Sequence, residues 1–306
     1  MSEQAINRRR LLASAAAVGG LSLGLSLVPG AARAASEATA RGRRSAATWE
    51  NIIEKSSFGS STAFSQEWNP LYPWDGDADT HNGAARMNAG QISLSGGVLT
   101  LTATRLAAPD GTSPHEPLAP LWYRSGAVHA KEQILVDDQF PEYDIEGEFR
   151  TQTGTGIWPA FWTTGTWPAW PPETDILEYV GNRTNLFNTW NKTPSGDEGE
   201  EPNGDAYVTR AKISGHEPDS WHKYRVWMSK DGDDVLLDYY FDGVYQATHR
   251  GVGWAGVPQW LIINLQMGSW ASGVEPGDPG WSDQPGPSGS TYFRARNVWA
   301  GRTRAW

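Results

Sequence analysis

A chain of 306 residues with 35 acidic and 25 basic side chains has a formal charge of −10 at neutral pH. This balance disfavours nucleic acids and anionic membranes as partners, because both carry the same sign of charge. The chain has no cysteine, so disulfides and thiol chemistry are excluded. Core packing alone must hold the fold.

The N-terminus predicts a secretory signal over residues 1–34. Three arginines, Arg8 to Arg10, precede an apolar stretch, and Ala32-Arg33-Ala34 offers small residues for cleavage. Paired arginines before two leucines are typical of the bacterial twin-arginine export route. We therefore expect a secreted, extracellular protein without stable membrane association after cleavage. A retained transmembrane anchor is the alternative.

Residues 35–47 are rich in Ala, Ser, Glu and Arg and lack a hydrophobic period, so we expect a disordered spacer there. Without residues 1–34 the chain has 21 basic and 34 acidic side chains, a formal charge of −13. Residues 48–306 are long enough for one large domain, and no internal repeat or Pro/Gly linker divides them. We expect a monomer.

Short β-rich runs dominate this domain and predict an all-β fold. Turn signals separate them, such as Asp231-Gly232 and Asp242-Gly243, which favour tight hairpins. No long helical period follows the N-terminal segment. Many short strands without helices indicate a sandwich or a barrel. The expected strands are 98–103, 143–149, 224–228, 235–241 and 261–265.

Several common chemistries lack their motifs in this chain. It contains no G-x-S-x-G elbow, H-E-x-x-H zinc helix, Walker loop or dinucleotide fingerprint. Residues 75–79 (D-G-D-A-D) begin like a calcium loop, but Thr80 stands where glycine is needed and Arg86 where the closing glutamate is needed. We expect a surface loop beside the functional cleft there, not an EF-hand.

Two tryptophans in residues 156–162 (G-I-W-P-A-F-W) share one face of an extended segment. Alternation places Trp158, Ala160 and Trp162 on that face. Indole rings have flat apolar faces that suit the C–H faces of pyranose rings, so this pair predicts a stacking platform for sugar. The alternative is that both rings belong to the hydrophobic core.

Three acids stand in residues 172–180 (P-E-T-D-I-L-E-Y-V), a run with β-strand character. Acids are depleted from strands, so fold stability does not explain them. Alternation separates Glu178 from Glu173 and Asp175, but a β-bulge at Ile176 or Leu177 would return Glu178 to their face. Two carboxyl groups converging to roughly 5 to 5.5 Å suit a retaining glycosidase. The alternative is a solvated acidic strand edge.

Together these two motifs closely resemble the core signature of glycoside hydrolase family 16, in the bulged branch that includes laminarinases, agarases and carrageenases. Weaker similarities extend the resemblance over most of the chain. They lie at Tyr123–Val128, Trp221–Trp227, Tyr240–Tyr245 and Trp260–Trp270. The resemblance implies a jelly-roll β-sandwich of the concanavalin-like type, with a concave sheet that carries the substrate cleft.

The resemblance also implies roles for individual residues. Glu173 would be the nucleophile, Asp175 its electrostatic partner and Glu178 the acid/base. Trp158 and Trp162 would be sugar platforms in the cleft. The remaining implied substrate-binding residues are Arg124, Asn191 and Gln266.

Two departures from the family pattern narrow these expectations. Laminarinases typically read V-H-G-T-L-H on the next strand, whereas residues 185–191 read N-L-F-N-T-W-N, with Phe187 and Asn191 in place of the histidines. The family's terminal strand usually carries an Asp that helps to hold a structural calcium, but Tyr292–Trp299 contains no acid. A structural calcium is therefore not supported, and no cofactor is expected to be required.

The sequence thus predicts a retaining endo-β-glycan hydrolase that acts on a neutral polysaccharide. An endo-1,3(4)-β-glucanase is the first expectation. A galactan hydrolase of the agarase or carrageenase kind, or a transglycosylase, is the alternative. A lectin-like module that only binds sugar is a further alternative, although binding alone would need neither a nucleophile nor an acid.

Overall fold

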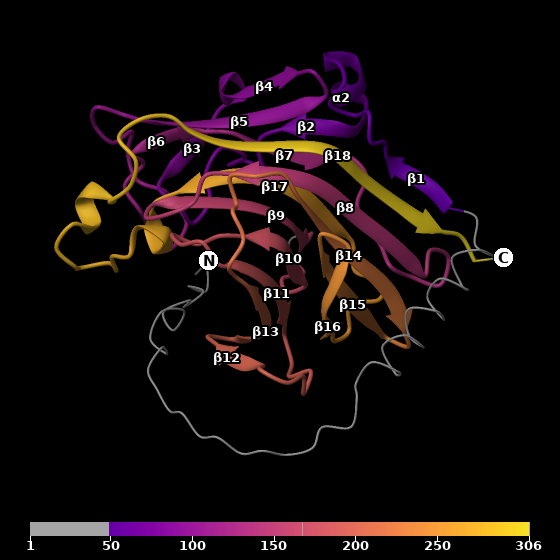
Figure 1. Cartoon of the computed structure of the whole chain (residues 1–306). Coiled ribbons are helices and arrows are strands. Elements are labelled where there is room, and N and C mark those ends of the chain that lie inside the picture. Colours follow the sequence, from indigo (N-terminus) through magenta and orange to yellow (C-terminus); the bar gives the residue numbers. More distant parts are fainter. Residues whose placement is uncertain (1–48, 167, 306) are drawn as a thin grey trace.

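The computed structural model describes residues 49–166 and 168–305, so the expected signal peptide and spacer lie outside the described residues. The described chain forms two large sheets that pack face to face (Figure 1). This arrangement confirms the all-β jelly-roll sandwich predicted from the sequence.

The larger sheet has ten strands. They are β1 Trp49–Ile53, β3 Ala85–Met87, β4 Ile92–Ser95, β5 Val98–Arg105, β6 Tyr123–Ser125, β8 Glu142–Thr151, β14 His222–Asp231, β15 Asp234–Phe241, β16 Val244–Gly251 and β18 Thr291–Thr303. Eight of them follow the order β16-β15-β14-β8-β18-β5-β6-β3, while β1 pairs with β18 and β4 pairs with β5. The long strand β18 therefore runs beside β8 through the middle of this sheet (Figure 1).

The smaller sheet has eight strands and carries both motifs singled out above. They are β2 Trp68–Pro70, β7 Ala127–Ala130, β9 Ile157–Gly165, β10 Glu173–Glu178, β11 Asn185–Asn191, β12 Glu201–Asn203, β13 Ala206–Ile213 and β17 Gln259–Met267. Their order is β12-β13-β11-β10-β9-β17-β7-β2, all antiparallel. The acid-bearing strand β10 is thus central in the sheet, not at an edge.

All five expected strands lie within observed ones, each extended by a few residues. The predicted hairpin at Asp242-Gly243 is also confirmed: Phe241 pairs with Val244, and both turn residues have positive φ, 48° and 77°. Two positive φ angles define the type I′ turn, whose twist matches that of the flanking strands.

Helices are few and short in the described residues. The α-helix α2 spans Ser61–Glu67, and the 3₁₀ turns are η1 Ala89–Gln91, η2 Ser269–Ser272 and η3 Trp281–Asp283. The sequence analysis missed α2, because seven residues are too few for a helical hydrophobic period. Its start is marked by the Ser60 hydroxyl, which accepts a hydrogen bond from the Ala63 N–H at 3.0 Å. None of the helices described here is long and apolar enough to cross a membrane.

The core fills the space between the two sheets. From β8, Phe149 reaches the facing sheet, where its ring centroid lies 4.7 Å from that of Phe161 on β9. Phe293 of β18 stacks on the Phe149 ring, with the two centroids 5.4 Å apart. Buried aromatic contacts of this kind contribute about 0.5–1.5 kcal/mol beyond the area they bury. They hold β9, and with it the neighbouring β10, against a rigid layer.

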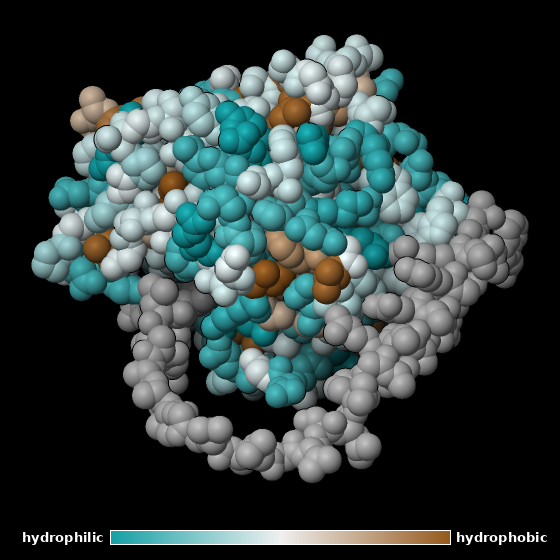
Figure 2. Space-filling view, viewed as in Figure 1, coloured by the Kyte–Doolittle hydropathy of each residue, from teal (hydrophilic) through white to brown (hydrophobic). Residues whose placement is uncertain are grey.

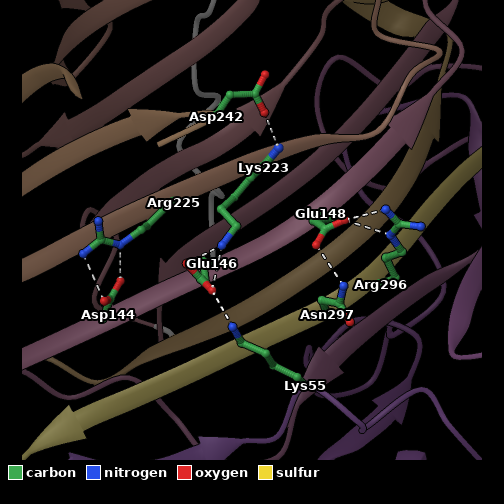
Figure 3. A network of polar contacts seen from close by, with 9 residues as sticks. All are labelled: Lys55, Asp144, Glu146, Glu148, Lys223, Arg225, Asp242, Arg296 and Asn297. Carbon is green, nitrogen blue, oxygen red and sulfur yellow. Dashed lines mark hydrogen bonds and ion pairs between the residues drawn. The ribbon is translucent and has the colours of Figure 1, made fainter. Parts of the chain in front are cut away.

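The outward face of β8 carries acids that do have a structural explanation. Asp144, Glu146 and Glu148 alternate with the inward residues of the strand, and each meets basic or amide groups of neighbouring strands (Figure 3). The partners are Arg225 for Asp144, Lys55 and Lys223 for Glu146, and Arg296 and Asn297 for Glu148. These cross-strand pairs stabilise the sheet modestly.

The surface of the domain is mostly polar. Figure 2 shows hydrophilic residues over most of the visible face, with hydrophobic ones in small separate patches. Among the residues described, the large hydrophobic side chains that are well exposed are Leu118 and Val244. Scattered apolar residues of this kind are normal on a protein surface.

Candidate active site

The expected bulge is present in β10. Asp175 pairs with Trp162 of β9 and Leu177 pairs with the adjacent Phe161, so Ile176 is the extra residue. Glu178 then lies opposite Ala160, on the same face of the sheet as Trp162. The bulge therefore gathers all three acids of the strand on one face.

These acids lie in a hollow on the smaller sheet. It is lined by His81, Asn82, Trp158, Ala160, Trp162, Glu173, Asp175, Glu178, Asn264 and Gln266. The acids are only 3–6% exposed. Since removing carboxylates from water is costly, their burial rules out the solvated strand edge considered above.

Indole and amide N–H groups hydrogen-bond the acids. Trp170 Nε1 donates to Glu173 Oε2 at 2.9 Å, and Trp158 Nε1 donates to Glu178 Oε1 at 2.8 Å. The amide Nδ2 of one asparagine, Asn188, donates to Asp175 Oδ2 at 2.7 Å and to Glu178 Oε2 at 2.8 Å. Hydrogen bonds to ionised acceptors are the strong ones in proteins, so these donors hold the carboxyl groups in fixed orientations.

Both predicted platform tryptophans line the hollow. Trp162 Nε1 donates to Asn264 Oδ1 of β17 at 2.7 Å, which fixes the plane of its ring. The Trp158 ring meets Trp270 edge to face at 5.5 Å. Each ring thus has one part packed into the protein and another at the wall of the hollow.

A loop that follows β2 forms another wall. His81 and Asn82 line the hollow, and the His81 ring lies 5.9 Å from that of Trp162. Trp74 stacks on the buried ring of Tyr72 at 5.4 Å. The surface loop expected at residues 75–79 precedes His81 in the same connection, and there Asp77 Oδ2 accepts from the Thr80 hydroxyl. Aromatic rings beside polar groups are typical of sugar-binding clefts.

Gln266 also lines the hollow, as predicted. Its Oε1 accepts hydrogen bonds from the N–H groups of Ala85 at 3.1 Å and Met267 at 3.0 Å. Its Nε2 donates to the Tyr72 hydroxyl at 3.4 Å. Burial raises the pKa of that hydroxyl, which therefore stays neutral.

Two predicted substrate-binding residues lie elsewhere. Arg124 is absent from the lining of the hollow and forms an ion pair with Asp110 at 2.7 Å. Asn191 is buried on the opposite face of β11 from Asn188, because it stands three positions further along the strand and side chains alternate between the two faces. Its side chain donates to the Arg250 carbonyl and accepts from the Val252 N–H. Both residues are structural in this arrangement.

Phe187 and Asn191 stand where the family pattern has histidines. Phe187 packs in the core with its ring 4.9 Å from that of Tyr239, and Asn191 binds backbone groups. Neither position lines the hollow. Their identities therefore do not act on a sugar by direct contact.

The sequence analysis missed several residues of the site, namely Asn188, Asn264, Trp170, His81 and Asn82. One of them follows from alternation, since Asn264 stands two residues before Gln266 and so shares its face. Asn188 follows from strand register, as the cross-strand partner of Asp175. The other three lie on loops, where no periodic pattern indicates orientation.

Among residues 49–166 and 168–305, no three His, Asp or Glu side chains gather as a metal site would require. These residues thus do not fit a side-chain calcium site.

Comparisons with known proteins agree with this geometry. The sequence matches the profile of Glycosyl hydrolases family 16 over residues 85–294. It is 37% identical to a galactan endo-beta-1,3-galactanase of Flammulina velutipes over 256 residues, which cover 82% of this chain and 90% of that protein.

Two solved structures share the fold. The laminarinase catalytic domain from Thermotoga maritima superposes with a TM-score of 0.56 at 18% identity, over 84% of this chain and 99% of that one. Porphyranase B from Zobellia galactanivorans gives 0.57 at 19%, over 85% and 94%. The family match and the 37% identical relative, together with the sandwich fold, define an endo-acting β-glycan hydrolase. The chain belongs to glycosyl hydrolases family 16, as its two motifs predicted.

Proposed function

We propose that this protein is a secreted, retaining endo-β-1,3-galactanase. The observation that carries the substrate is the 37% identity to a galactan endo-beta-1,3-galactanase, which extends over 90% of that protein. The sequence alone put a 1,3(4)-β-glucan first and a galactan second. The relative reverses that order, and the glucan becomes the competing outcome of the test.

The proposed reaction is a double displacement. Glu173 attacks the anomeric carbon, the bond to the leaving sugar breaks, and Glu178 gives its proton to the departing oxygen. Glu178 then takes a proton from water while the water oxygen bonds to the anomeric carbon, and the electron pair returns to Glu173. The bulge supports this proposal, because it places both glutamates on one face of β10.

Asp175 and Asn188 support the two glutamates in this proposal. Asp175 lies between them along the strand, and Asn188 joins its carboxylate to that of Glu178. Neighbouring carboxylates disfavour one another's ionisation, so the trio can hold the proton that Glu178 must donate.

A panel of purified polysaccharides tests the substrate. β-1,3-Galactan, β-1,3-glucan, mixed-linkage glucan and agarose are each incubated with the enzyme, and the products are sized with time. We expect β-1,3-galactan to yield a ladder of oligosaccharides, since an endo enzyme cuts within chains. Faster cleavage of a glucan would overturn the substrate assignment. Products longer than the starting chains would indicate transglycosylation.

The nucleophile is tested with Glu173→Gln and Glu173→Ala. We expect Glu173→Gln to lose turnover but keep its fold and its oligosaccharide binding, because the amide retains the shape of the carboxylate. Azide should restore cleavage to Glu173→Ala and give a glycosyl azide of inverted configuration, detected by NMR. Wild-type turnover in Glu173→Gln would end this assignment. Absence of cleavage by both the wild type and the variant would favour the lectin alternative.

Export is a separate part of the proposal. The arginines of residues 8–10 and the apolar stretch after them support twin-arginine secretion with cleavage after Ala34. Replacing Arg9 and Arg10 by Lys should retain the enzyme inside the producing cell. Enzyme that still reaches the medium with an N-terminus at Ala35 would require a different export route.

A further inference from the structure

Trp170 makes a contact with Glu173 that the family motifs do not indicate. Its Nε1 donates to Glu173 Oε2 at 2.9 Å. The indole lies in the segment that joins β9 to β10, outside both motifs. Its ring centroid is 6.2 Å from that of the buried Trp190 on β11, in a small apolar cluster with Val208, separate from the main core.

The segment that carries Trp170 is held by backbone contacts. Gly165 N donates to the Pro172 carbonyl at 2.7 Å, and Ala169 N donates to the Thr166 carbonyl at 2.9 Å. A Cβ on Gly165 would come within 1.8 Å of the Ala169 carbonyl oxygen, so the segment folds back onto Gly165 as closely as glycine permits. The indole N–H thus has a fixed direction toward Glu173.

We propose that Trp170 is a positioning residue that stabilises the ionised form of Glu173 and thereby speeds the second half of the reaction. This inference rests on the proposed double displacement. With Oε2 bound to the indole, Oε1 is the atom that attacks, and Oε2 becomes the carbonyl oxygen of the glycosyl ester.

The charge on Glu173 explains why the Trp170 N–H affects the two half-reactions differently. The carboxylate loses its charge when the ester forms and regains it when water releases the sugar. A donor binds a carboxylate more strongly than an ester carbonyl. The Trp170 N–H therefore favours departure of Glu173 from the sugar, while its effect on the first attack is small or opposed.

The test uses the 2,4-dinitrophenyl β-glycoside of β-1,3-galactobiose, whose leaving group needs no help from an acid. For Trp170→Phe, which keeps an aromatic ring but removes the N–H, we expect kcat to fall about tenfold, as for loss of a hydrogen bond to a charged group. We expect kcat/KM to change less than threefold, because it reports the first step. A burst of dinitrophenol and an accumulated glycosyl-enzyme, seen by mass spectrometry, should accompany the fall.

Two variants separate this role from a merely structural one. Val208→Ala loosens the same apolar cluster without removing an N–H, and should leave the ratio of kcat to kcat/KM unchanged. Trp299→Phe removes an indole donor on the other sheet, where Nε1 donates to Asn51 at 2.9 Å, and should leave both constants unchanged. Equal falls in kcat and kcat/KM for Trp170→Phe, or the same pattern in Val208→Ala, would overturn the proposal.

Failure of the proposed function has a different signature. If azide did not rescue Glu173→Ala, the double displacement itself would be wrong, whatever Trp170 does. If the wild type cleaved only the β-1,3-glucobiose analogue, the substrate would be wrong, and the Trp170 comparison would be made on that analogue with the same expected split.

Discussion

The carboxyl groups in the hollow are oriented by N–H donors of neighbouring side chains. Trp158, Trp170 and Asn188 each direct a donor at a carboxyl group of β10, over 2.7–2.9 Å. The acids on the outer face of β8 contrast with this, since they meet Lys and Arg side chains (Figure 3). A fixed dipole orients a carboxylate without the full charge that would hold it permanently ionised. In the proposed reaction this suits Glu178, which must give up a proton and regain it.

Asn188 gives a prediction at this scale. Asn188→Ala removes the donor shared by Asp175 and Glu178, and we expect kcat on the polysaccharide to fall at least tenfold. Because the donor stabilises ionised carboxylates, its loss should also move the pH–rate profile to higher pH. The measurement is kcat/KM against pH, with circular dichroism to confirm the fold. An unmoved profile at wild-type rate would show that the amide has no part in catalysis.

Among the secondary-structure elements, β10 depends on one extra residue. A regular strand with the same sequence would turn Glu178 away from Glu173, and Ile176 prevents this by standing outside the ladder with β9. The neighbouring Leu177 is fully buried, so the bulge is held by packing as well as by hydrogen bonds. The gathering of the three acids on one face is thus a property of the strand and its neighbour together.

Two changes at Leu177 test the bulge. Leu177→Ala keeps the residue count, and we expect most activity to remain while stability falls by ~2 to 5 kcal/mol, measured by chemical denaturation. Deleting Leu177 gives E-T-D-I-E, in which regular alternation keeps the acids on one face but shifts the register of everything after it. We expect lower stability with residual activity above that of Glu178→Gln. A deletion variant no more active than Glu178→Gln would contradict the prediction that the shortened strand keeps its three acids on one face.

At the scale of the whole molecule, the two sheets are joined by buried polar contacts as well as by the core. His249 of β16 lies between them, where its Nδ1 and the Thr189 hydroxyl of β11 are 3.0 Å apart. The Tyr239 ring lies edge-on to it at 4.9 Å. Burial lowers the pKa of His249 to about 4, so the ring is neutral at the pH of most assays.

The stability of the sandwich should therefore depend on pH. Between the ordinary histidine pKa of about 6.5 and the folded value of about 4, the unfolded chain binds a proton that the folded chain does not. The contribution of His249 is thus fully present above pH ~6.5 and declines as the pH falls to ~4, by about 3 kcal/mol.

The measurement is the free energy of unfolding at several pH values, for the wild type and for His249→Gln. The difference between the two should shrink or reverse as the pH falls from ~6.5 to ~4. Burial also lowers the pKa values of His129 and His216, so the variant should keep part of the slope. Parallel curves over the whole range would show that His249 does not titrate as described.

Local patterns in the sequence determined most of the architecture. Alternation, turn residues and the spacing of three acids predicted the strands, the hairpin at Asp242-Gly243, and the bulge at Ile176 or Leu177. These features depend on residues a few positions apart, and the period of two in a strand is the same in every sheet. For the same reason the gathering of Glu173, Asp175 and Glu178 on one face with Trp158 and Trp162 could be expected from the sequence.

The tertiary structure decided which distant residues meet the triplet. Trp170 and Asn188 contact the acids, and His81 and Asn82 line the hollow, whereas Arg124 and Asn191 are engaged elsewhere. The contacts of Asn188 follow from strand register, and those of Trp170 and His81 from the path of loops across the sheet. Loop paths and register are set by packing between segments far apart in the chain, and no local periodicity encodes them.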